Sequence, residues 1–176
     1  MSFFRWNVVG EVPAGEKFVL IGAPHTSNWD FIYFLGAATE LNVPLSFMGK
    51  KQLFRWPLAR AMRELGGIAI DRSSSRNYVQ SMVDEFAKRD SFMLTIAPEG
   101  TRSKVARWKT GFYHIAIQAK VPLVLGLMDY SKKQVGLAGA IWPTGDYLKD
   151  MEKVLEFYQK TTPRHPRQGS VDFGQL

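Results

Sequence analysis

The chain has 176 residues, no cysteine and a formal net charge of +7. A chain of this length can bury about two-thirds of its unfolded surface, so we expect one domain that needs no disulfide or metal to fold. The absence of cysteine excludes disulfides, thiol catalysis and Cys-ligated zinc or iron–sulfur sites. The basic excess favours an anionic partner, such as a nucleic acid, an anionic membrane surface, a phosphorylated substrate or an acidic carrier.

Short apolar runs alternate with helical patterns along the whole chain. The expected strands are residues 7–9, 18–21, 45–48, 68–70, 92–96 and 123–128, with 134–137 as a further candidate. The expected helices are residues 30–41, 57–65, 77–88, 111–119 and 146–158. This alternation predicts an α/β fold in which a mainly parallel or mixed central sheet carries helices on both faces.

The whole chain, residues 1–176, is expected to be this single domain, with a lead-in at its N-terminus and a tail at its C-terminus. Residues 1–17 read as an N-terminal lead-in without the pattern of a signal peptide. Residues 162–176 carry two prolines and scattered charges, and we expect a loosely held tail. The longest weakly charged stretch, residues 31–49, is interrupted by Glu40 and Pro44, so the sequence predicts no transmembrane helix.

Several familiar catalytic and binding motifs are missing. Residues 10–17 resemble a phosphate-binding loop, but Glu16 occupies the position of the lysine. Neither the dinucleotide-binding G-x-G-x-x-G pattern nor the G-x-S-x-G pattern of hydrolases occurs. The histidines, His25, His114 and His165, are far apart and lack metal-ligand spacing, so we expect no metal site.

One histidine lies where an apolar run turns into a helical pattern. The run stops at Gly22 and Pro24, so His25 falls in the turn and Asp30 in the first helical turn. A structural interpretation makes Ser27 and Asp30 a capping box and His25 an ordinary hydrogen-bonded histidine. A functional interpretation makes His25 a general base for a substrate hydroxyl, oriented by Asp30.

Four blocks in chain order resemble the motifs of the glycerolipid acyltransferase family, whose familiar bacterial member is 1-acylglycerol-3-phosphate acyltransferase. The blocks are HTSNWD at 25–30, GGIAIDR at 66–72, PEGTRS at 98–103 with a following Lys109-Thr-Gly element, and VPLV at 121–124. The last block lacks a proline that is usual in the family. Each block alone is a weak match, whereas four in order at suitable spacing are specific.

The resemblance implies transfer of a fatty acyl group from a thioester to the hydroxyl of a lysophosphatidic acid-like glycerolipid. The donor would be acyl-coenzyme A or acyl carrier protein, and no other cofactor is implied. His25 would be the general base and Asp30 its orienting acid. The substrate-binding residues implied by the motifs are Arg72, Glu99, Gly100, Thr101, Arg102 and Lys109.

These implied substrate contacts have individual roles and structural alternatives. Arg102, with Arg72 and Lys109, would clamp an acceptor phosphate, since arginine offers a bidentate fork. Glu99 would accept a glycerol hydroxyl or hold Arg102, or would simply pair with a buried arginine. Gly100 would offer its N–H to a phosphate or oxyanion, or would be a turn glycine. Thr101 could be a cap, and Arg72 could be half of a strand-end ion pair.

Residues 50–65 combine an apolar stripe with several cations. The stripe at helical spacing comprises Phe54, Leu58, Ala61, Met62 and Leu65. We interpret it most simply as core. Trp56, Arg60 and Arg63 fall on the opposite side, which suits either an anionic membrane surface or an ordinary solvated helix face.

We therefore expect a cytoplasmic enzyme that associates peripherally with the membrane. Its expected partners are an acyl thioester donor, a lysophospholipid-type acceptor and an anionic membrane surface. No nucleic-acid motif is present, so we expect no nucleic-acid partner. Two alternatives stay open: the same chemistry on another acceptor, such as glycerol 3-phosphate or a lyso-aminolipid, and a non-catalytic basic module that binds anionic membrane or nucleic acid.

Overall fold

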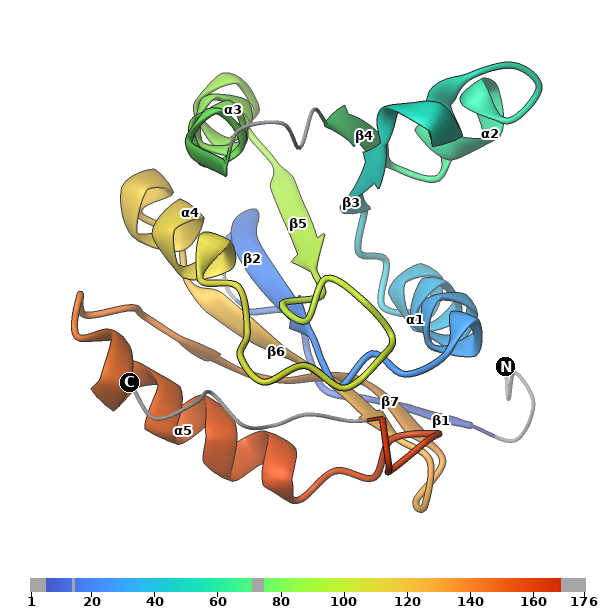
Figure 1. Cartoon of the computed structure of the whole chain (residues 1–176), viewed down its shortest axis with the longest axis vertical. Helices are drawn as coiled ribbons and strands as arrows, with labels where there is room; N and C mark the ends of the chain where they lie inside the picture. Colours follow the sequence, from blue (N-terminus) through green and yellow to red (C-terminus); the bar gives the residue numbers. More distant parts are fainter. Residues whose placement is uncertain (1–5, 14, 71–74, 169–176) are drawn as a thin grey trace.

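The computed structural model describes residues 6–13, 15–70 and 75–168. They form a seven-stranded sheet in the order β1-β7-β6-β2-β5-β3-β4 (Figure 1). The strands are β1 (Asn7–Val9), β2 (Lys17–Gly22), β3 (Leu45–Lys50), β4 (Gly67–Ile70), β5 (Phe92–Ile96), β6 (Leu123–Asp129) and β7 (Gln134–Ile141). Neighbours pair in parallel except β6 and β7, which are antiparallel. The predicted α/β fold with a mixed sheet is confirmed.

Helices cover both faces of the sheet. They are α1 (Asn28–Glu40), the 3-10 helix η2 (Lys51–Phe54), α2 (Ala59–Glu64), α3 (Ser75–Lys88), α4 (Gly111–Ala119) and α5 (Tyr147–Gln159). Buried side chains of α3, α4 and α5 share one hydrophobic cluster, and those of α1 belong to clusters on the opposite face. Figure 1 shows α1 separated from α4 and α5 by the strands.

Strand β2 shows why a continuous apolar run becomes the centre of this sheet. Val19 and Ile21 point into the cluster under α3, α4 and α5, whereas Phe18 and Leu20 point into the cluster under α1. All four side chains are almost completely buried. Successive side chains of a strand face opposite sides, so a strand with helices on both faces must be apolar at every position. Each such burial stabilises the fold by about 1.5–3 kcal/mol.

The register of the parallel strands brings several loops to one edge of the sheet. Ile21 of β2 is level with Ile96 of β5, and Gly22 is level with Gly126 of β6. The carboxyl ends of β2, β5 and β6 therefore meet at the same edge. The segments that leave this edge are the ones that hold functional groups in open α/β sheets.

Residues 51–65, which contain η2 and α2 and which we call the η2–α2 corner, are less buried than the sequence predicted. Phe54 is buried and Met62 is half-buried, but Leu58 and Leu65 are 52% and 41% exposed. The interpretation of this stripe as core was therefore right for Phe54 but wrong for Leu58, Ala61 and Leu65, which are exposed. Helix α2 is shorter than the predicted 57–65, and it packs mainly against η2 and β4 at the edge of the sheet, where none of the other helices in the described residues covers it (Figure 1).

The segment after α5 returns to the carboxyl edge of the sheet. The Tyr130 N–H donates to the Thr162 carbonyl at 2.8 Å, and the His165 N–H donates to Thr26 Oγ1 at 3.2 Å. These bonds attach residues 162–168, the described part of the expected tail, to the loops that follow β6 and β2.

Candidate active site

The start of α1 is built by its own side chains. Ser27 is the N-cap, and its Oγ accepts the Trp29 N–H at 3.2 Å. Asp30 Oδ2 reaches back to accept the N–H groups of Ser27 and Thr26, both at 2.8 Å. The capping box is therefore formed, and because Ser27 supplies the cap, the helix begins at Asn28 rather than at the predicted residue 30.

The same aspartate also contacts the histidine. His25 Nδ1 lies 3.3 Å from Asp30 Oδ2, and the His25 side chain is 28% exposed. The structural and functional interpretations are thus compatible, since one carboxylate caps the helix and meets the imidazole. In the tautomer whose Nδ1–H donates to Asp30, the nitrogen lone pair available to accept a proton is on Nε2. A general base needs this tautomer.

Tyr130 holds the other oxygen of Asp30. Its hydroxyl donates to Asp30 Oδ1 at 2.6 Å. Burial by itself raises the pKa of Asp30, but the hydrogen bonds from His25, Tyr130, Ser27 and Thr26 outweigh it, so the pKa lies below its ordinary value. Asp30 therefore stays charged and can stabilise an imidazolium. Tyr130 was not predicted from the sequence, although its place just after an apolar run, where a strand ends, was a usable signal.

Glu99 lies behind the histidine loop. Its side chain is buried, and Oε1 accepts the His25 N–H at 3.1 Å. Within the described structure Oε2 has no hydrogen-bond partner, and burial raises the pKa of Glu99 to about 7. The contact found for Glu99 is with the His25 backbone, whereas Arg102, its suggested partner, donates from Nη1 to Asn28 Oδ1.

The turn after β5 places two further residues of the third motif. Gly100 has φ +65°, in the left-handed region that favours glycine, and its N–H donates to the Ala97 carbonyl at 3.1 Å. A Cβ at this position would lie 2.9 Å from Lys109 Nζ, so the glycine lets the lysine cross the turn. Thr101 Oγ1 accepts the Ser103 N–H at 3.3 Å.

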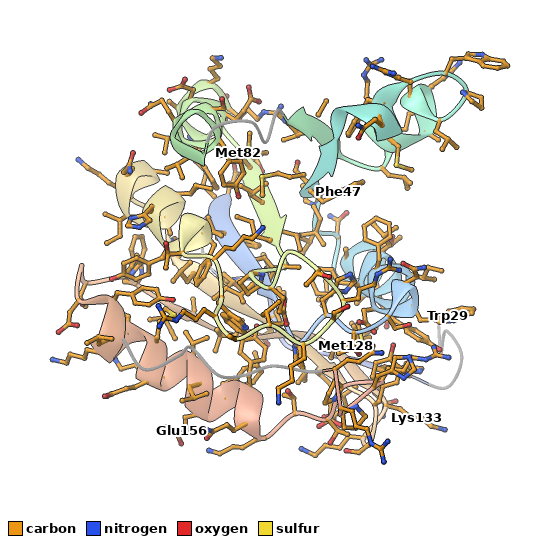
Figure 2. The ribbon with its side chains drawn as sticks, viewed as in Figure 1. Trp29, Phe47, Met82, Met128, Lys133 and Glu156 are labelled. Carbon is orange, nitrogen blue, oxygen red and sulfur yellow. The ribbon has the colours of Figure 1, made fainter. Side chains whose placement is uncertain are left out.

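A cavity of about 1680 Å³ opens at this edge of the sheet. The predicted site residues that line it are His25, Asp30, Gly100, Thr101, Arg102 and Lys109. Most of the remaining wall is apolar and comes from α1, β3, β6 and the 97–112 segment; it includes Phe31, Phe34, Phe47, Met48, Trp108, Phe112 and Met128. Phe47 and Met128 are labelled in Figure 2. The arrangement places an imidazole and two cationic side chains beside a space lined mainly by apolar side chains.

The outcome for the sequence-predicted residues is uneven. Glu99 is absent from the cavity wall as the described residues define it. Arg72 lies outside the described residues, so its role stays a prediction. Asn28 lines the cavity and was missed as an individual residue. In the part of the chain that the structure describes, no three His, Asp or Glu side chains are grouped as ligands for a metal ion.

Known proteins resemble this chain over most of its length. Residues 5–125 match the family model described as Acyltransferase. The 1-acyl-sn-glycerol-3-phosphate acyltransferase of Salmonella typhimurium is 31% identical over 122 residues, which cover 65% of this chain and 48% of the relative. The enzyme of that name from Limnanthes douglasii is 35% identical over 140 residues, which cover 67% of this chain and 50% of the relative. The chain thus spans about half the length of the curated relatives it matches.

A solved structure has a similar fold. The crystal structure of the 1-acyl-sn-glycerophosphate (LPA) acyltransferase, PlsC, from Thermotoga maritima aligns with a TM-score of 0.58, covering 85% of this chain and 67% of that chain. The sequence identity is 20%, so this likeness concerns the fold alone. Since the family model matches well over half of the chain, including the histidine and arginine motifs at the cavity, the chain belongs to the Acyltransferase family.

Proposed function

We propose that this protein transfers a fatty acyl group from an acyl thioester to the free hydroxyl of a lysophosphatidic acid-type acceptor. The observation that carries the proposal is the His25–Asp30 pair, with 3.3 Å between Nδ1 and Oδ2, on the wall of a large and mainly apolar cavity. The names of the relatives supply the acceptor class, since they denote acyltransferases that act on 1-acyl-sn-glycerol-3-phosphate.

The reaction requires one proton shuttle. His25 Nε2 takes the hydroxyl proton of the acceptor as its oxygen attacks the thioester carbonyl carbon. The charge of Asp30 stabilises the resulting imidazolium. The tetrahedral oxyanion then collapses, the carbon–sulfur bond breaks, and the proton passes from the imidazolium to the departing sulfur. The products are an ester and a free thiol, without a covalent enzyme intermediate, because the substrate itself brings the nucleophile.

Positive charge and apolar surface lie where the substrates need them. Arg102 and Lys109 line the same cavity as His25 and provide cations for the acceptor phosphate or for the developing oxyanion. Phe31 and Phe47 meet edge to face with ring centroids 5.0 Å apart, and both belong to the cavity wall. The wall can therefore shield an acyl chain from water while the charged end stays near His25.

A direct assay tests this proposal. The purified protein is incubated with acyl-coenzyme A or acyl-acyl carrier protein and with lysophosphatidic acid, glycerol 3-phosphate or a lyso-aminolipid, and the products are identified by mass. We expect a diacylglycerol 3-phosphate product from lysophosphatidic acid and loss of that product in His25→Ala. Transfer to glycerol 3-phosphate or to the lyso-aminolipid, but not to lysophosphatidic acid, would contradict the proposed acceptor and keep the acyl-transfer chemistry. No transfer to any of them would leave a binding module.

The η2–α2 corner supports a membrane-associated site of action. Trp56 is 92% exposed, and Leu58 and Leu65 are exposed beside it. Arg55 and Arg63 are exposed on the same corner. An indole and aliphatic side chains among arginines suit the headgroup layer of an anionic membrane. We propose an anionic phospholipid surface as the partner of this corner.

The wall of the cavity reaches the η2–α2 corner. Met62 of α2 lines the cavity, as do Phe31 and Ile32 of α1, which are 36% and 41% exposed. A lysophospholipid leaving a bilayer could therefore reach His25 along apolar surface. None of the helices in the described residues combines the length and hydropathy needed to cross a bilayer.

Vesicle sedimentation tests the membrane partner. Vesicles of phosphatidylcholine alone are compared with vesicles that also contain phosphatidylglycerol, at low and high salt. We expect binding that needs the anionic lipid and weakens with salt, because exposed charge pairs are screened. Equal binding to both vesicle types would contradict the proposal.

A further inference from the structure

We infer that the segment after α5 completes a phosphate-binding pocket beside the start of α1. A second cavity, of about 520 Å³, lies between this segment and the histidine and arginine motifs. Its wall contains Arg102, Arg164 and His165, and its other described residues are neutral. Arg164 and His165 lie beyond residues 5–125, the part of the chain that matches the family model.

The pocket is held in place by long-range contacts. The His165 N–H donates to Thr26 Oγ1, which attaches the segment directly to the histidine motif. The Arg164 guanidinium carbon lies 5.6 Å from the Trp29 ring centroid and 5.9 Å from the Tyr130 ring centroid. Two aromatic rings therefore fix the orientation of the guanidinium before a ligand arrives, which reduces the entropy lost on binding.

The chemistry of the wall selects a phosphate group. Arg102 and Arg164 each carry a planar fork of N–H donors, and such forks match phosphate oxygens in a bidentate way. Ser27 and Asn28 add neutral polar groups to the same wall. A phosphate monoester would thus meet two positive charges without meeting a carboxylate on the described wall.

The position of the pocket connects it to the proposed reaction. Arg102 and Asn28 line both cavities, and Arg102 donates to Asn28 Oδ1 between them. A phosphorylated substrate can therefore place its phosphate by Arg164 while its reacting end faces His25. This assignment of the ligand rests on the proposed acyl transfer. The phosphate can come from the acceptor or from the acyl donor, and the experiment separates these sources.

Binding of small anions tests the pocket without any need for catalysis. Isothermal titration with inorganic phosphate and with glycerol 3-phosphate is carried out on the wild type and on Arg164→Gln. The matched control is Arg167→Gln, which removes the same charge from an exposed arginine of the same segment that is not part of the pocket wall.

We expect Arg164→Gln to weaken binding of these anions by roughly tenfold or more, because a charge-assisted contact is lost. Arg167→Gln should bind as the wild type does, and Arg164→Lys should keep part of the affinity. Unchanged affinity in Arg164→Gln, or an equal loss in both glutamine variants, would overturn the pocket. Circular dichroism checks that the variants are folded.

Kinetics then identify which substrate carries the phosphate. Lysophosphatidic acid is compared with monoacylglycerol as acceptor, and acyl-coenzyme A with a phosphate-free acyl thioester of N-acetylcysteamine as donor. A KM rise in Arg164→Gln confined to lysophosphatidic acid assigns the acceptor, and one confined to acyl-coenzyme A assigns the donor. An equal fall of kcat for every substrate pair would indicate an effect through Tyr130 and Asp30, and would overturn a phosphate role. If no acyl transfer occurs at all, the titrations alone decide the pocket.

Discussion

The corner around His25 and the corner around α2 are built in opposite ways. At the first, Asp30 is buried and accepts hydrogen bonds on both oxygens, from Tyr130 and from the backbone of the loop. At the second, Trp56 and Leu58 are largely exposed, and Arg60 makes only a surface ion pair with Glu64 at 2.7 Å. Figure 1 shows α2 beyond β3 and β4, at the far end of the molecule from α5.

The difference matches what each corner is proposed to do. A proposed general base must keep its geometry, and the carboxylate beside His25 is itself held by Tyr130 and by the loop backbone. A surface that meets lipid must instead leave apolar and cationic side chains uncovered. Substitutions at the first corner should therefore change catalysis or stability, whereas those at the second should change membrane binding and leave catalysis and stability largely intact.

The strongest test of this contrast removes the base. We expect His25→Ala to lower kcat by about 10²–10⁴, the usual contribution of a general base, with little change in the unfolding temperature. The matched control is His114→Ala, because His114 also lines the cavity, from α4. Acyl transfer is measured by product mass at saturating substrate. Turnover close to wild type in His25→Ala would remove this residue from the chemistry.

The buried carboxyl of Glu99 should make the active-site corner sensitive to pH. Burial raises the pKa of Glu99 from 4.5 to about 7, so between these values the folded state holds a proton that the unfolded state has released. The free energy of unfolding should therefore fall by about 3 kcal/mol as pH rises through this window.

Denaturant unfolding on either side of that pH window measures the effect of Glu99. Glu99→Gln keeps an oxygen for the His25 N–H but cannot titrate, so its stability should change much less with pH over the same interval. An equally steep pH dependence in Glu99→Gln would assign the effect to another group.

Removing the Tyr130 hydroxyl should have a smaller effect at the same corner. Tyr130→Phe deletes a 2.6 Å hydrogen bond to a charged carboxylate, which we expect to cost about 1.5–3 kcal/mol of stability at neutral pH. This hydrogen bond helps to lower the pKa of Asp30 in the folded state. The stability that the bond supplies is therefore fully present above the ordinary pKa of an aspartate, and it is lost as pH falls through the lowered pKa of Asp30. The difference between Tyr130→Phe and wild type should therefore shrink in acid. Chemical denaturation at several pH values measures it, and a constant difference would argue against a role through Asp30.

The smallest effects are expected at the α2 corner. Trp56→Ser and Arg63→Gln should each weaken binding to anionic vesicles, by about 1 kcal/mol for the arginine, without changing kcat on a detergent-dispersed substrate. The controls are Trp142→Ser, since Trp142 is 65% exposed at another site, and Lys149→Gln on α5. Equal losses in the controls would show that this corner is not a specific contact surface.

The local pattern of apolar residues in the sequence predicted most of the strands and helices. Phe92–Ile96 and Gly111–Ala119 were predicted with the bounds that the structure has, because apolar run length and helical spacing are properties of neighbouring residues. The capping box of Ser27 and Asp30 was foreseeable for the same reason, since its partners are within one helical turn. The exposed α2 stripe was not, because a stripe at helical spacing carries no information on whether another layer will cover it.

Sequence pattern alone thus predicted the strands, the helices to within a few residues and the capping box of Ser27 and Asp30, and it left open whether Asp30 also reaches His25. Tertiary structure decided the contacts between distant residues: Tyr130 reaches Asp30 across 100 residues, Glu99 reaches His25 across 74, and His165 reaches Thr26 across 139. Such contacts depend on the order of strands in the sheet and on the positions of the loops. Neither can be read from the spacing of apolar residues along the sequence. The long-range contacts to His25 and Asp30, and the position of Arg164 near Tyr130, arise only because the parallel strands bring their carboxyl ends to one edge of the sheet.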